Sequence, residues 1–426
     1  MHQMTLGDND TGSDWETPVG FEWPLQPNRL AACRRLEHFA ASAGRAYQTH
    51  RNTDRGMGCH VNVSALSPYL RHRMIEETEV LETVLAKHSE SAAFKFVQEV
   101  FWRGYWKGWL EHRGQLWPEY QRQLPQCLHH TQQDKRLWEL YGQAISGTTA
   151  IPLFNEWCLE LQRTGYLHNH ARMWFASIWI FTLELPWRVG ADFFYQHLLD
   201  GDPASNTLGW RWVAGLHTRG KTYQAQSWNI AKFSAGRFSP SDTDLAAAAP
   251  SLDHTEPEGL PPAAPLRTPQ TFDPALPTAL LITEEDCRPE DFSLATLDIR
   301  AAATLSASHL RSPRQVAPMV TAFEAAALAD AASRSGLDCE KMQAGADCDL
   351  AAWAERVGIK QIVTPYIPEG PLRDWLRLVE PKLATQGIAF CEWRRDWDAA
   401  IWPHSTAGFF KVKERIPRIL QDLRMT

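Results

Sequence analysis

The chain has 426 residues, which is long enough for two domains with separate cores. Apolar residues make up 44% and charged residues 22%, a balance that excludes a fibrous or largely disordered chain. The formal net charge of −7 gives no overall attraction to nucleic acid, so a contact with DNA would require a local basic groove.

Helical periodicity dominates the first half of the chain. The segments Pro27–Gln48, Ile75–Lys87 and Ser91–Leu110 each place apolar residues on one face of a helix. Few stretches alternate with the period of a strand. We predict an all-α domain over residues 27–238, preceded by an extension of residues 1–26.

The composition changes sharply at residues 239–277. This stretch holds nine prolines among acidic, alanine and serine residues, with a single aromatic residue. Such a composition cannot bury enough apolar surface to fold alone. We predict an extended, semi-stiff linker between two domains.

A second pattern, in which strands alternate with helices, follows the linker. The expected strands are Thr278–Thr283, Ala295–Thr304, Gln361–Thr364 and Ile388–Trp393, and the expected helices are Met319–Ser335, Asp349–Val357 and Gly370–Gln386. This alternation is typical of a parallel sheet. We predict a smaller, Rossmann-like α/β domain over residues 278–426. It has no glycine fingerprint of a dinucleotide or P-loop site, so it is expected to be a structural remnant or a platform for a protein partner.

The chain shows no targeting, membrane or metal signal. Its most apolar run, Met173–Leu183, is shorter than the ~20 residues that cross a bilayer. The N-terminal MHQMTLGDNDTGSD is unlike a signal peptide, so we expect a cytoplasmic protein without a membrane partner. The eight cysteines form no C-x-x-C pair. Reduced thiols and no metal site are expected, with an iron–sulfur cluster as the less favoured alternative.

Residues 168–215 hold an unusual mixture of histidine, asparagine, arginine, carboxylates and indoles. Buried polar groups must be satisfied, and here they stand beside indoles in close register. The mixture predicts a pocket for a large, flat, partly charged ligand.

Two further clusters fit such a ligand. Ser64 and Ser67 stand at a predicted helix start, where unpaired N–H groups bind a diphosphate; the alternative is an ordinary N-cap at Ser67. Glu99, Trp102 and Arg103 share one helix face, where an indole can stack on an extruded base and a carboxylate can accept its N–H groups. The alternative there is a plain surface Glu–Arg pair.

These motifs resemble the flavin-binding region of the cryptochrome/photolyase family. The family pattern Y-x-x-x-R, T-S-x-L-S-P-Y, E-x-x-W-R, HNxxRM, W, D-x-D and N-x-x-x-W-x-W occurs here in order, with Val63 in place of the threonine. The similarity is strong over residues 40–235 and weak over residues 278–415. In the family the α/β domain precedes the flavin domain, so this chain looks circularly permuted.

The resemblance implies an FAD cofactor with a defined set of contacts. The implied contacts are Tyr47, Ser64, Leu66, Ser67, Arg103, Asn169, Arg172, Asp200, Asp202 and Asn206. Arg103 would reach the diphosphate, and Arg172 would pair with Asp200. Asp202 would hold the ring and the ribitol or adenine side, and Asn206 would face flavin N5. A second, antenna chromophore is left open.

The resemblance also implies catalytic residues. The implied set is Glu99, Trp102, Met173, Asn206 and Trp212. A flipped pyrimidine dimer would lie between Trp102 and Trp212, with Glu99 stabilising it when charged. Met173 and Asn206 follow the pattern of enzymes that repair pyrimidine dimers.

An electron path is implied as well. Trp210 would be the indole nearest the flavin and Trp187 the next, although both can be simple core residues. The family's third indole is expected at Ala144 and is missing, so Trp138 or Tyr141 would substitute.

Two other departures from the family pattern concern charge. His170 stands where repair enzymes usually have arginine. His217, Arg219 and Lys221 enter the loop after Trp212, where they suit either phosphate contacts or a solvated loop.

The resulting hypothesis is a flavoprotein with light-driven electron transfer. The favoured version is a photolyase-like enzyme, a deoxyribodipyrimidine photolyase, which repairs pyrimidine dimers in damaged DNA. The alternatives are a cryptochrome-like blue-light photoreceptor without repair activity and a light-independent flavin-binding scaffold. The sequence leaves light dependence, DNA affinity and oligomeric state open.

Overall fold

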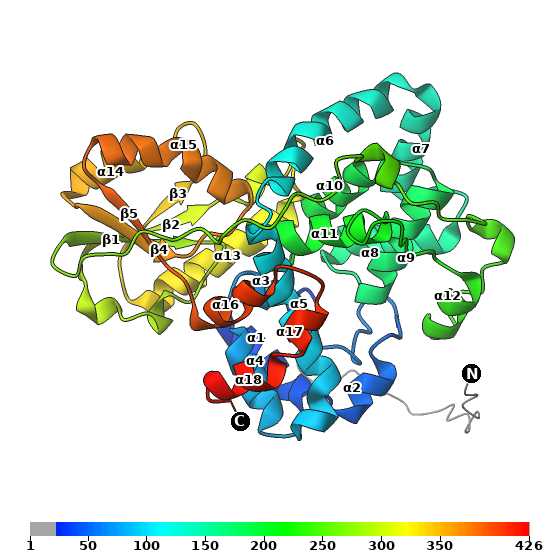
Figure 1. Ribbon diagram of the computed structural model, residues 1–426, viewed down its shortest axis with the longest axis horizontal. Helices are drawn as coiled ribbons and strands as arrows, with labels where there is room; N and C mark the ends of the chain where they lie inside the picture. Colours follow the sequence, from blue (N-terminus) through cyan, green and yellow to red (C-terminus); the bar gives the residue numbers. More distant parts are fainter. Residues whose placement is uncertain (1–22, 426) are drawn as a thin grey trace.

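The computed structural model describes residues 23–425 and shows a helical part beside an α/β part (Figure 1). Most of the predicted N-terminal extension lies outside the described residues. Within those residues, no strand forms before Pro277, and a five-stranded parallel sheet follows. The predicted fold class, helical first and α/β second, is confirmed. Among the helices described, none has both the length and the apolar character needed to span a membrane.

Within residues 23–238, the helical part contains twelve α-helices and one π-helical turn. They are α1 (Arg29–Ala40), α2 (Arg45–His50), α3 (Ser67–Arg71), α4 (Glu77–Leu85), α5 (Glu90–Glu111), α6 (Leu116–Gln133), α7 (Lys135–Ser146), α8 (Pro152–Thr164), α9 (Asn169–Ser177), η1 (Ile178–Thr182), α10 (Trp187–His197), α11 (Pro203–Val213) and α12 (Ser227–Phe233).

The predicted helix over residues 27–48 is two helices, and His88 explains the break. Its ring Nε2 donates to the carbonyl of Ala40 at the end of α1, at 2.8 Å. The same ring lies against Gly44, where an added Cβ would be 2.7 Å from Nδ1. Glycine is therefore needed at the start of α2. This long-range contact could not be seen in the sequence.

The α/β part is a three-layer arrangement. The strands are β1 (Pro277–Thr283), β2 (Asp298–Ser306), β3 (Cys339–Gln343), β4 (Gln361–Pro365) and β5 (Ala389–Trp393), in the order β3-β2-β1-β4-β5. Helix α13 (Pro318–Ser335) covers one face, and α14 (Leu350–Val357) and α15 (Pro371–Thr385) cover the other (Figure 1). The edge strand β3 was not predicted, because Glu340 and Lys341 are exposed and interrupt any apolar run.

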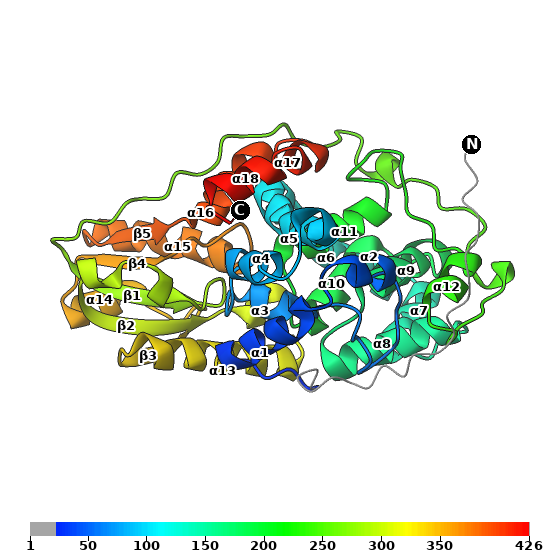
Figure 2. The ribbon, with the colours of Figure 1, turned by 90° about the horizontal axis from the view of Figure 1, so that it is seen from below.

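The C-terminal segment returns to the helical part and packs on α5 (Figures 1 and 2). It comprises α16 (Asp396–Ile401), α17 (Phe410–Lys413) and α18 (Ile416–Asp422). Two glycines of α5 make room for it. A Cβ added at Gly104 would lie 3.0 Å from Ile401, and one at Gly108 would lie 2.6 Å from Trp402. The C-terminal segment therefore packs closely against α5.

The proline-rich segment crosses the surface between the two parts, as Figure 2 shows along the upper edge of the molecule. Two short 3₁₀ turns, Asp242–Asp244 and Asp253–Thr255, are its regular structure. Glu256 pairs with Arg188 at 2.7 Å and with Arg211 at 2.6 Å. The segment is thus anchored to the helical part along its path, while the domain boundaries stay a prediction.

A buried ion network joins the two parts at the C-terminal end of β1. Glu284 accepts from Arg311 at 3.0 Å, and Glu285 accepts from Arg71 of α3 at 2.8 Å. Lys107 of α5 lies 3.5 Å from Glu285. Ligands of open parallel sheets bind where the strand order reverses, here between the ends of β1 and β4. At the β1 end the carboxylates instead contact the helical part.

Candidate functional site

The residues predicted to bind the cofactor come together from four elements. Ser64 and Ser67 stand at the start of α3, Arg103 on α5, Arg172 on α9, and Asp202 at the start of α11. Ser64, Ser67, Arg103 and Arg172 are half-buried in otherwise buried surroundings. These four side chains are therefore partly accessible to a ligand.

The predicted Arg172–Asp200 pair forms. The guanidinium donates twice to the carboxylate, at 3.0 and 2.8 Å, and its Nε donates to the carbonyl of Leu167 at 3.0 Å. Burial acts to raise the pKa of Asp200, but the charge of Arg172 holds it below its usual range. The Arg172 side chain keeps 23% of its surface exposed. Asp200 therefore holds the guanidinium of Arg172 rigidly while part of it stays accessible.

The start of α11 is set by Asp202. Its Oδ1 accepts from the backbone N–H of Ser205 at 2.8 Å, which caps the helix. Its Oδ2 lies 3.3 Å from the ammonium of Lys107. Burial opposes ionisation, yet Lys107 and Arg103 together keep the pKa of Asp202 well below its usual range. Asp202 is therefore a fixed negative charge at neutral pH.

Asn206 and Gly209 lie further along α11. The amide nitrogen of Asn206 donates to the carbonyl of Ala191 on α10 at 2.8 Å, which fixes the orientation of the carboxamide. An added Cβ at Gly209 would meet no atom within 4 Å among residues 23–425, apart from its own helix turn and chain neighbours. Open space beside a helix backbone suits a flat ring.

The cation predicted to meet the diphosphate still has free donors. Within the part of the chain that the structure describes, Nε and Nη2 of Arg103 are buried and have no hydrogen-bond partner. Its nearest carboxylate, on Glu77, is 3.8 Å away. Buried guanidinium donors are rarely left unsatisfied, so an anionic group suits this position. The donor set and the space at Gly209 fit FAD.

The other predicted cofactor contacts differ in their exposure. Leu66 is fully buried, and Tyr47 is buried with its pKa raised by desolvation. Asn169 is exposed in the first turn of α9. Ala65, between Ser64 and Leu66, has a φ of +45°, a left-handed conformation uncommon outside glycine. Strain of this kind often marks a ligand-binding loop.

The predicted catalytic indoles each have a stacking partner in the structure. Trp102 lies face to face with Phe409, with ring centroids 3.9 Å apart and planes 13° apart. Trp212 stacks on Tyr223 at 5.5 Å. Phe409 belongs to the C-terminal segment, so sequence reasoning missed it. Any base that stacks on this face of Trp102 must first displace Phe409.

Glu99 and Met173 lie half-buried on α5 and α9. The carboxylate of Glu99 pairs with Arg51 at 2.7 Å and keeps 31% of its side-chain surface exposed. Burial raises its pKa, which the charge of Arg51 partly offsets. A carboxylate that is both accessible and partly desolvated can accept ring N–H groups of a ligand.

The loop after Trp212 carries less positive charge than its sequence suggested. His217 lies between Trp106 and Trp109, with ring centroids 4.8 and 4.6 Å away. Burial and the nearby Arg211 lower the pKa of His217 to about 4. It is therefore neutral at physiological pH, which leaves Arg219 and Lys221 as the exposed cations of this loop.

The indoles predicted to carry electrons have different aromatic neighbours. Trp210 contacts Trp179 at 6.2 Å, whereas Trp187 contacts Tyr120 at 6.0 Å. Trp138 stacks on Tyr141 at 5.4 Å. Sequence reasoning missed Trp179 because it stands inside an apolar run that reads as plain core.

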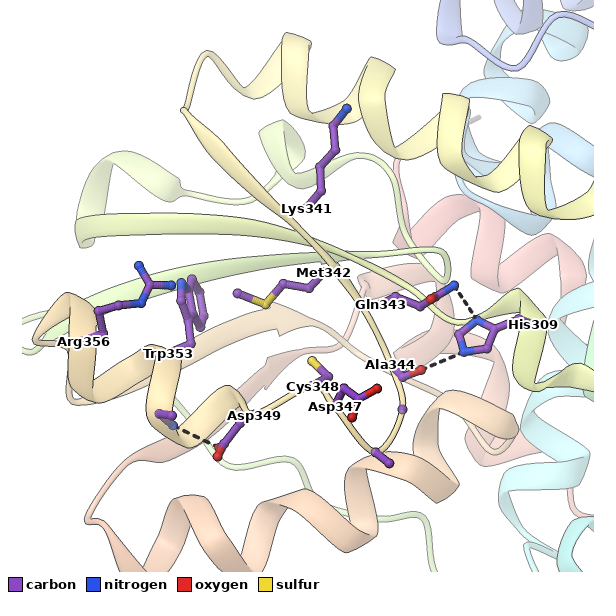
Figure 3. A pocket seen from close by; sticks show the side chains of 13 residues that line it. His309, Lys341, Met342, Gln343, Ala344, Asp347, Cys348, Asp349, Trp353 and Arg356 are labelled. Carbon is purple, nitrogen blue, oxygen red and sulfur yellow. Dashed lines mark hydrogen bonds between the residues drawn. The ribbon is translucent and has the colours of Figure 1, made fainter.

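A separate cavity of about 690 Å³ lies in the α/β part (Figure 3). It opens beside the end of β3 and the start of α14, and is lined by an indole, cations and carboxylates, among them His309, Lys341, Trp353 and Arg356. The imidazole of His309 donates to the carbonyl of Ala344 at 2.7 Å. The ring is therefore held as part of the wall. A group of His, Cys, Asp or Glu side chains able to hold a metal does not occur in the described residues.

Comparison with known proteins assigns the helical region. Residues 96–241 match the family model described as the FAD binding domain of DNA photolyase. This region is thus a photolyase-type FAD-binding domain, and FAD is confirmed as the predicted cofactor. The chain is similar to proteins of the cryptochrome/photolyase family, as its motifs predicted.

Individual proteins match parts of the chain. The chain is 30% identical to a deoxyribodipyrimidine photo-lyase of Synechococcus over 253 residues, which cover 57% of this chain and 50% of that one. It is 33% identical to the Streptomyces griseus enzyme over 156 residues, 36% of this chain and 32% of that one. A class III photolyase structure from Agrobacterium tumefaciens aligns with a TM-score of 0.39 and 22% identity, over 52% of this chain and 46% of that one. The chain spans about half the length of the Synechococcus relative.

Proposed function

We propose that the chain binds FAD non-covalently and uses it for light-driven electron transfer in the repair of pyrimidine dimers in DNA. The observation that carries FAD binding is the pair of buried guanidinium donors of Arg103, Nε and Nη2, that have no hydrogen-bond partner within the described residues. Photo-lyase relatives that align with about half of the chain support the activity and the DNA substrate.

The chain's residues would hold FAD in place from several sides. Arg103 and the helix start at Ser64 and Ser67 would bind the diphosphate, because unpaired N–H groups and positive charge favour an anion. Arg172, held by Asp200, would line the isoalloxazine. Asn206, whose amide nitrogen is fixed by Ala191, would present its carboxamide to N5. Bound FAD supplies the redox chemistry, while these residues supply position and electrostatics.

The repair step would use the residues around Trp102. Glu99 would accept N–H groups of a flipped dimer, and Trp102 and Trp212 would stack on its rings. Met173, half-buried on α9, would contact the dimer next to Asn206. For this geometry Phe409 must leave the face of Trp102 on which it now lies.

DNA contact requires a local basic surface, and the C-terminal segment offers one. Lys411 on α17, Arg415 between α17 and α18, and Arg418 on α18 are exposed; Glu414 is exposed among them, and Asp422 lies 3.6 Å from Arg418. Cations there would contact phosphates beside the covered indole, and binding would weaken with added salt.

The test has two stages. Purified protein is first examined for flavin by its visible absorbance; a colourless protein that also fails to bind added FAD would refute the cofactor proposal. Flavin-loaded protein is then photoreduced and illuminated with blue light in the presence of an oligonucleotide that contains a thymine dimer. Recovery of thymine absorbance supports repair, and its absence in the presence of bound flavin rules repair out.

A second function is favoured by the Phe409–Trp102 stack. An indole whose face is covered by the chain's own C-terminal segment suits a blue-light photoreceptor, in which the light-driven step changes the docking of that segment. Limited proteolysis in darkness and in light distinguishes the two functions. A light-dependent change of cleavage within residues 403–425, without dimer repair, would favour the photoreceptor.

A further inference from the structure

An unbroken row of aromatic rings connects the predicted flavin site with the surface. Trp210 on α11 contacts Trp179 at 6.2 Å, and Trp179 contacts Tyr141 at 6.1 Å. Tyr141 stacks on Trp138 at 5.4 Å. The first three rings are buried, and Trp138 is 42% exposed. The row therefore begins one residue from Gly209 and ends in solvent.

The row is built into the helices. Trp179 stands in η1, a π-helical turn directly after α9, and π-turns inside helices are frequent at functional sites. Gly190 of α10 lies where Trp210 and Trp179 meet. An added Cβ would be 2.4 Å from Trp210 and 2.8 Å from Nε1 of Trp179. A side chain at this position would force the two indoles apart.

The charges around Trp179 favour an oxidised indole. Its Nε1 donates to the carbonyl of Pro186 at 3.0 Å, and this hydrogen bond strengthens when the ring becomes positive. Its other ring neighbours include Phe175 and Phe193, which are uncharged. Loss of an electron from Trp179 is therefore assisted by the oxygen that faces its N–H group.

The charges around Trp187 have the opposite effect. The guanidinium of Arg188 lies 4.5 Å from its ring and that of Arg211 lies 5.8 Å away. Glu256 pairs with both arginines, so one carboxylate offsets two cations. A positive indole at this site would be repelled by these two guanidinium groups.

We propose that electrons reach Trp210 through Trp179, Tyr141 and Trp138, and that this route bypasses Trp187. The proposal rests on the proposed FAD function. Trp210 would give one electron to the excited flavin. Trp179 would then give one electron to the oxidised Trp210. Arg314 lies over Tyr141 at 5.3 Å, so Tyr141 serves as a bridge and does not hold the positive charge. Trp138 supplies the electron and releases its indole proton to water, and a soluble thiol then reduces the Trp138 radical.

Three Trp→Phe substitutions test the route. Trp179→Phe breaks the row in its middle, Trp138→Phe removes the exposed donor, and Trp187→Phe is the matched buried control. Flavin content is measured first for each variant. The rate of flavin photoreduction with a thiol is then compared under identical illumination. Because Trp138 is exposed, its replacement leaves the core intact and keeps the test valid if Trp179→Phe folds poorly.

A second readout follows the oxidised side chains and not the reduction of the flavin. After illumination in air without thiol, peptide mass spectrometry locates oxygenated tryptophan. We expect oxygenation at Trp138 in the parent protein and in Trp187→Phe, and its loss in Trp179→Phe. The photoreduction rate should fall about tenfold or more in Trp179→Phe and Trp138→Phe, and change less than about twofold in Trp187→Phe.

The outcomes separate the two proposals. Protein that binds no flavin would refute the proposed function, and the route with it. Flavin-loaded protein in which Trp187→Phe slows photoreduction as much as Trp179→Phe would refute the route alone. Oxygenation of Trp138 that survives Trp179→Phe would also refute it.

Discussion

Replacing Phe409 with alanine tests whether the C-terminal segment closes the Trp102 platform. Phe409 is 8% exposed, stacks on Trp102 at 3.9 Å and meets Tyr105 edge-on at 5.5 Å. Truncation of a buried phenylalanine costs about 3–5 kcal/mol. Because Phe409 stands in the turn before the short helix α17, where the chain can relax, we expect a loss near the lower end, about 3 kcal/mol, in urea unfolding.

The same substitution should tighten the binding of damaged DNA. A flipped base and Phe409 compete for one face of Trp102, and an aromatic pair of this kind contributes about 0.5–1.5 kcal/mol beyond its buried area. Removing the competitor therefore raises affinity for a dimer-containing oligonucleotide by up to about tenfold. Fluorescence anisotropy at fixed salt measures the effect.

Phe410 provides a matched control. It is the next residue, has the same side chain and is 74% exposed. Phe410→Ala should change stability by less than about 0.5 kcal/mol and should leave the Trp102 stack in place. If Phe409→Ala retains FAD but binds dimer-containing DNA no more tightly than Phe410→Ala, Phe409 does not block the platform.

Other substitutions test the interface and the site. Glu284→Gln leaves Arg311 without its carboxylate at 3.0 Å, so we expect a loss of about 3–5 kcal/mol in urea unfolding; a loss under about 1 kcal/mol would contradict a buried pair. Burial, followed by the charge of Glu369, raises the pKa of Glu111 from 4.5 to about 7. Its contribution to stability is therefore complete below pH 4.5 and is lost as the pH rises through about 7. In Glu111→Gln, the free energy of unfolding should fall less steeply with pH across this window than in the parent protein. If the urea midpoint depends on pH equally in both proteins, the raised pKa of Glu111 is contradicted. Asn206→Asp replaces a donor to the Ala191 carbonyl with an acceptor, which should cost about 1–3 kcal/mol and reduce the FAD content of purified protein; full FAD content and an unchanged Tm would show that the carboxamide is not needed.

Local signals in the sequence predicted much of the fold and the core of the site. Strands β1 and β4 were predicted within a residue at each end, because β-branched and apolar residues dominate them. The Arg172–Asp200 pair was predicted from motif resemblance and formed with bidentate geometry. These features depend on neighbouring residues or on a recognisable motif.

Features that depend on distant contacts were not predictable. Phe409 lies on Trp102 although 307 positions separate them in the chain, and no local pattern indicates the pairing. Trp179 lies in an apolar run that predicts an ordinary core residue. Its proposed part in electron transfer follows only from its position between Trp210 and Tyr141. His217 reads as a cation but is neutral, because two indoles and Arg211 surround it.

Glu284 and Glu285, which follow β1, predict how the protein behaves when its chain is cut between the helical part and the α/β part. Separated halves would leave Arg71 and Lys107 without Glu285 on one fragment, and Glu285 exposed without them on the other. At the surface where the fragments bind each other, one fragment would carry excess positive charge and the other excess negative charge. Electrostatic attraction should therefore speed their association at low salt. A chain cut within residues 239–277 should therefore behave as a split protein whose halves reassemble on mixing and separate as ionic strength rises.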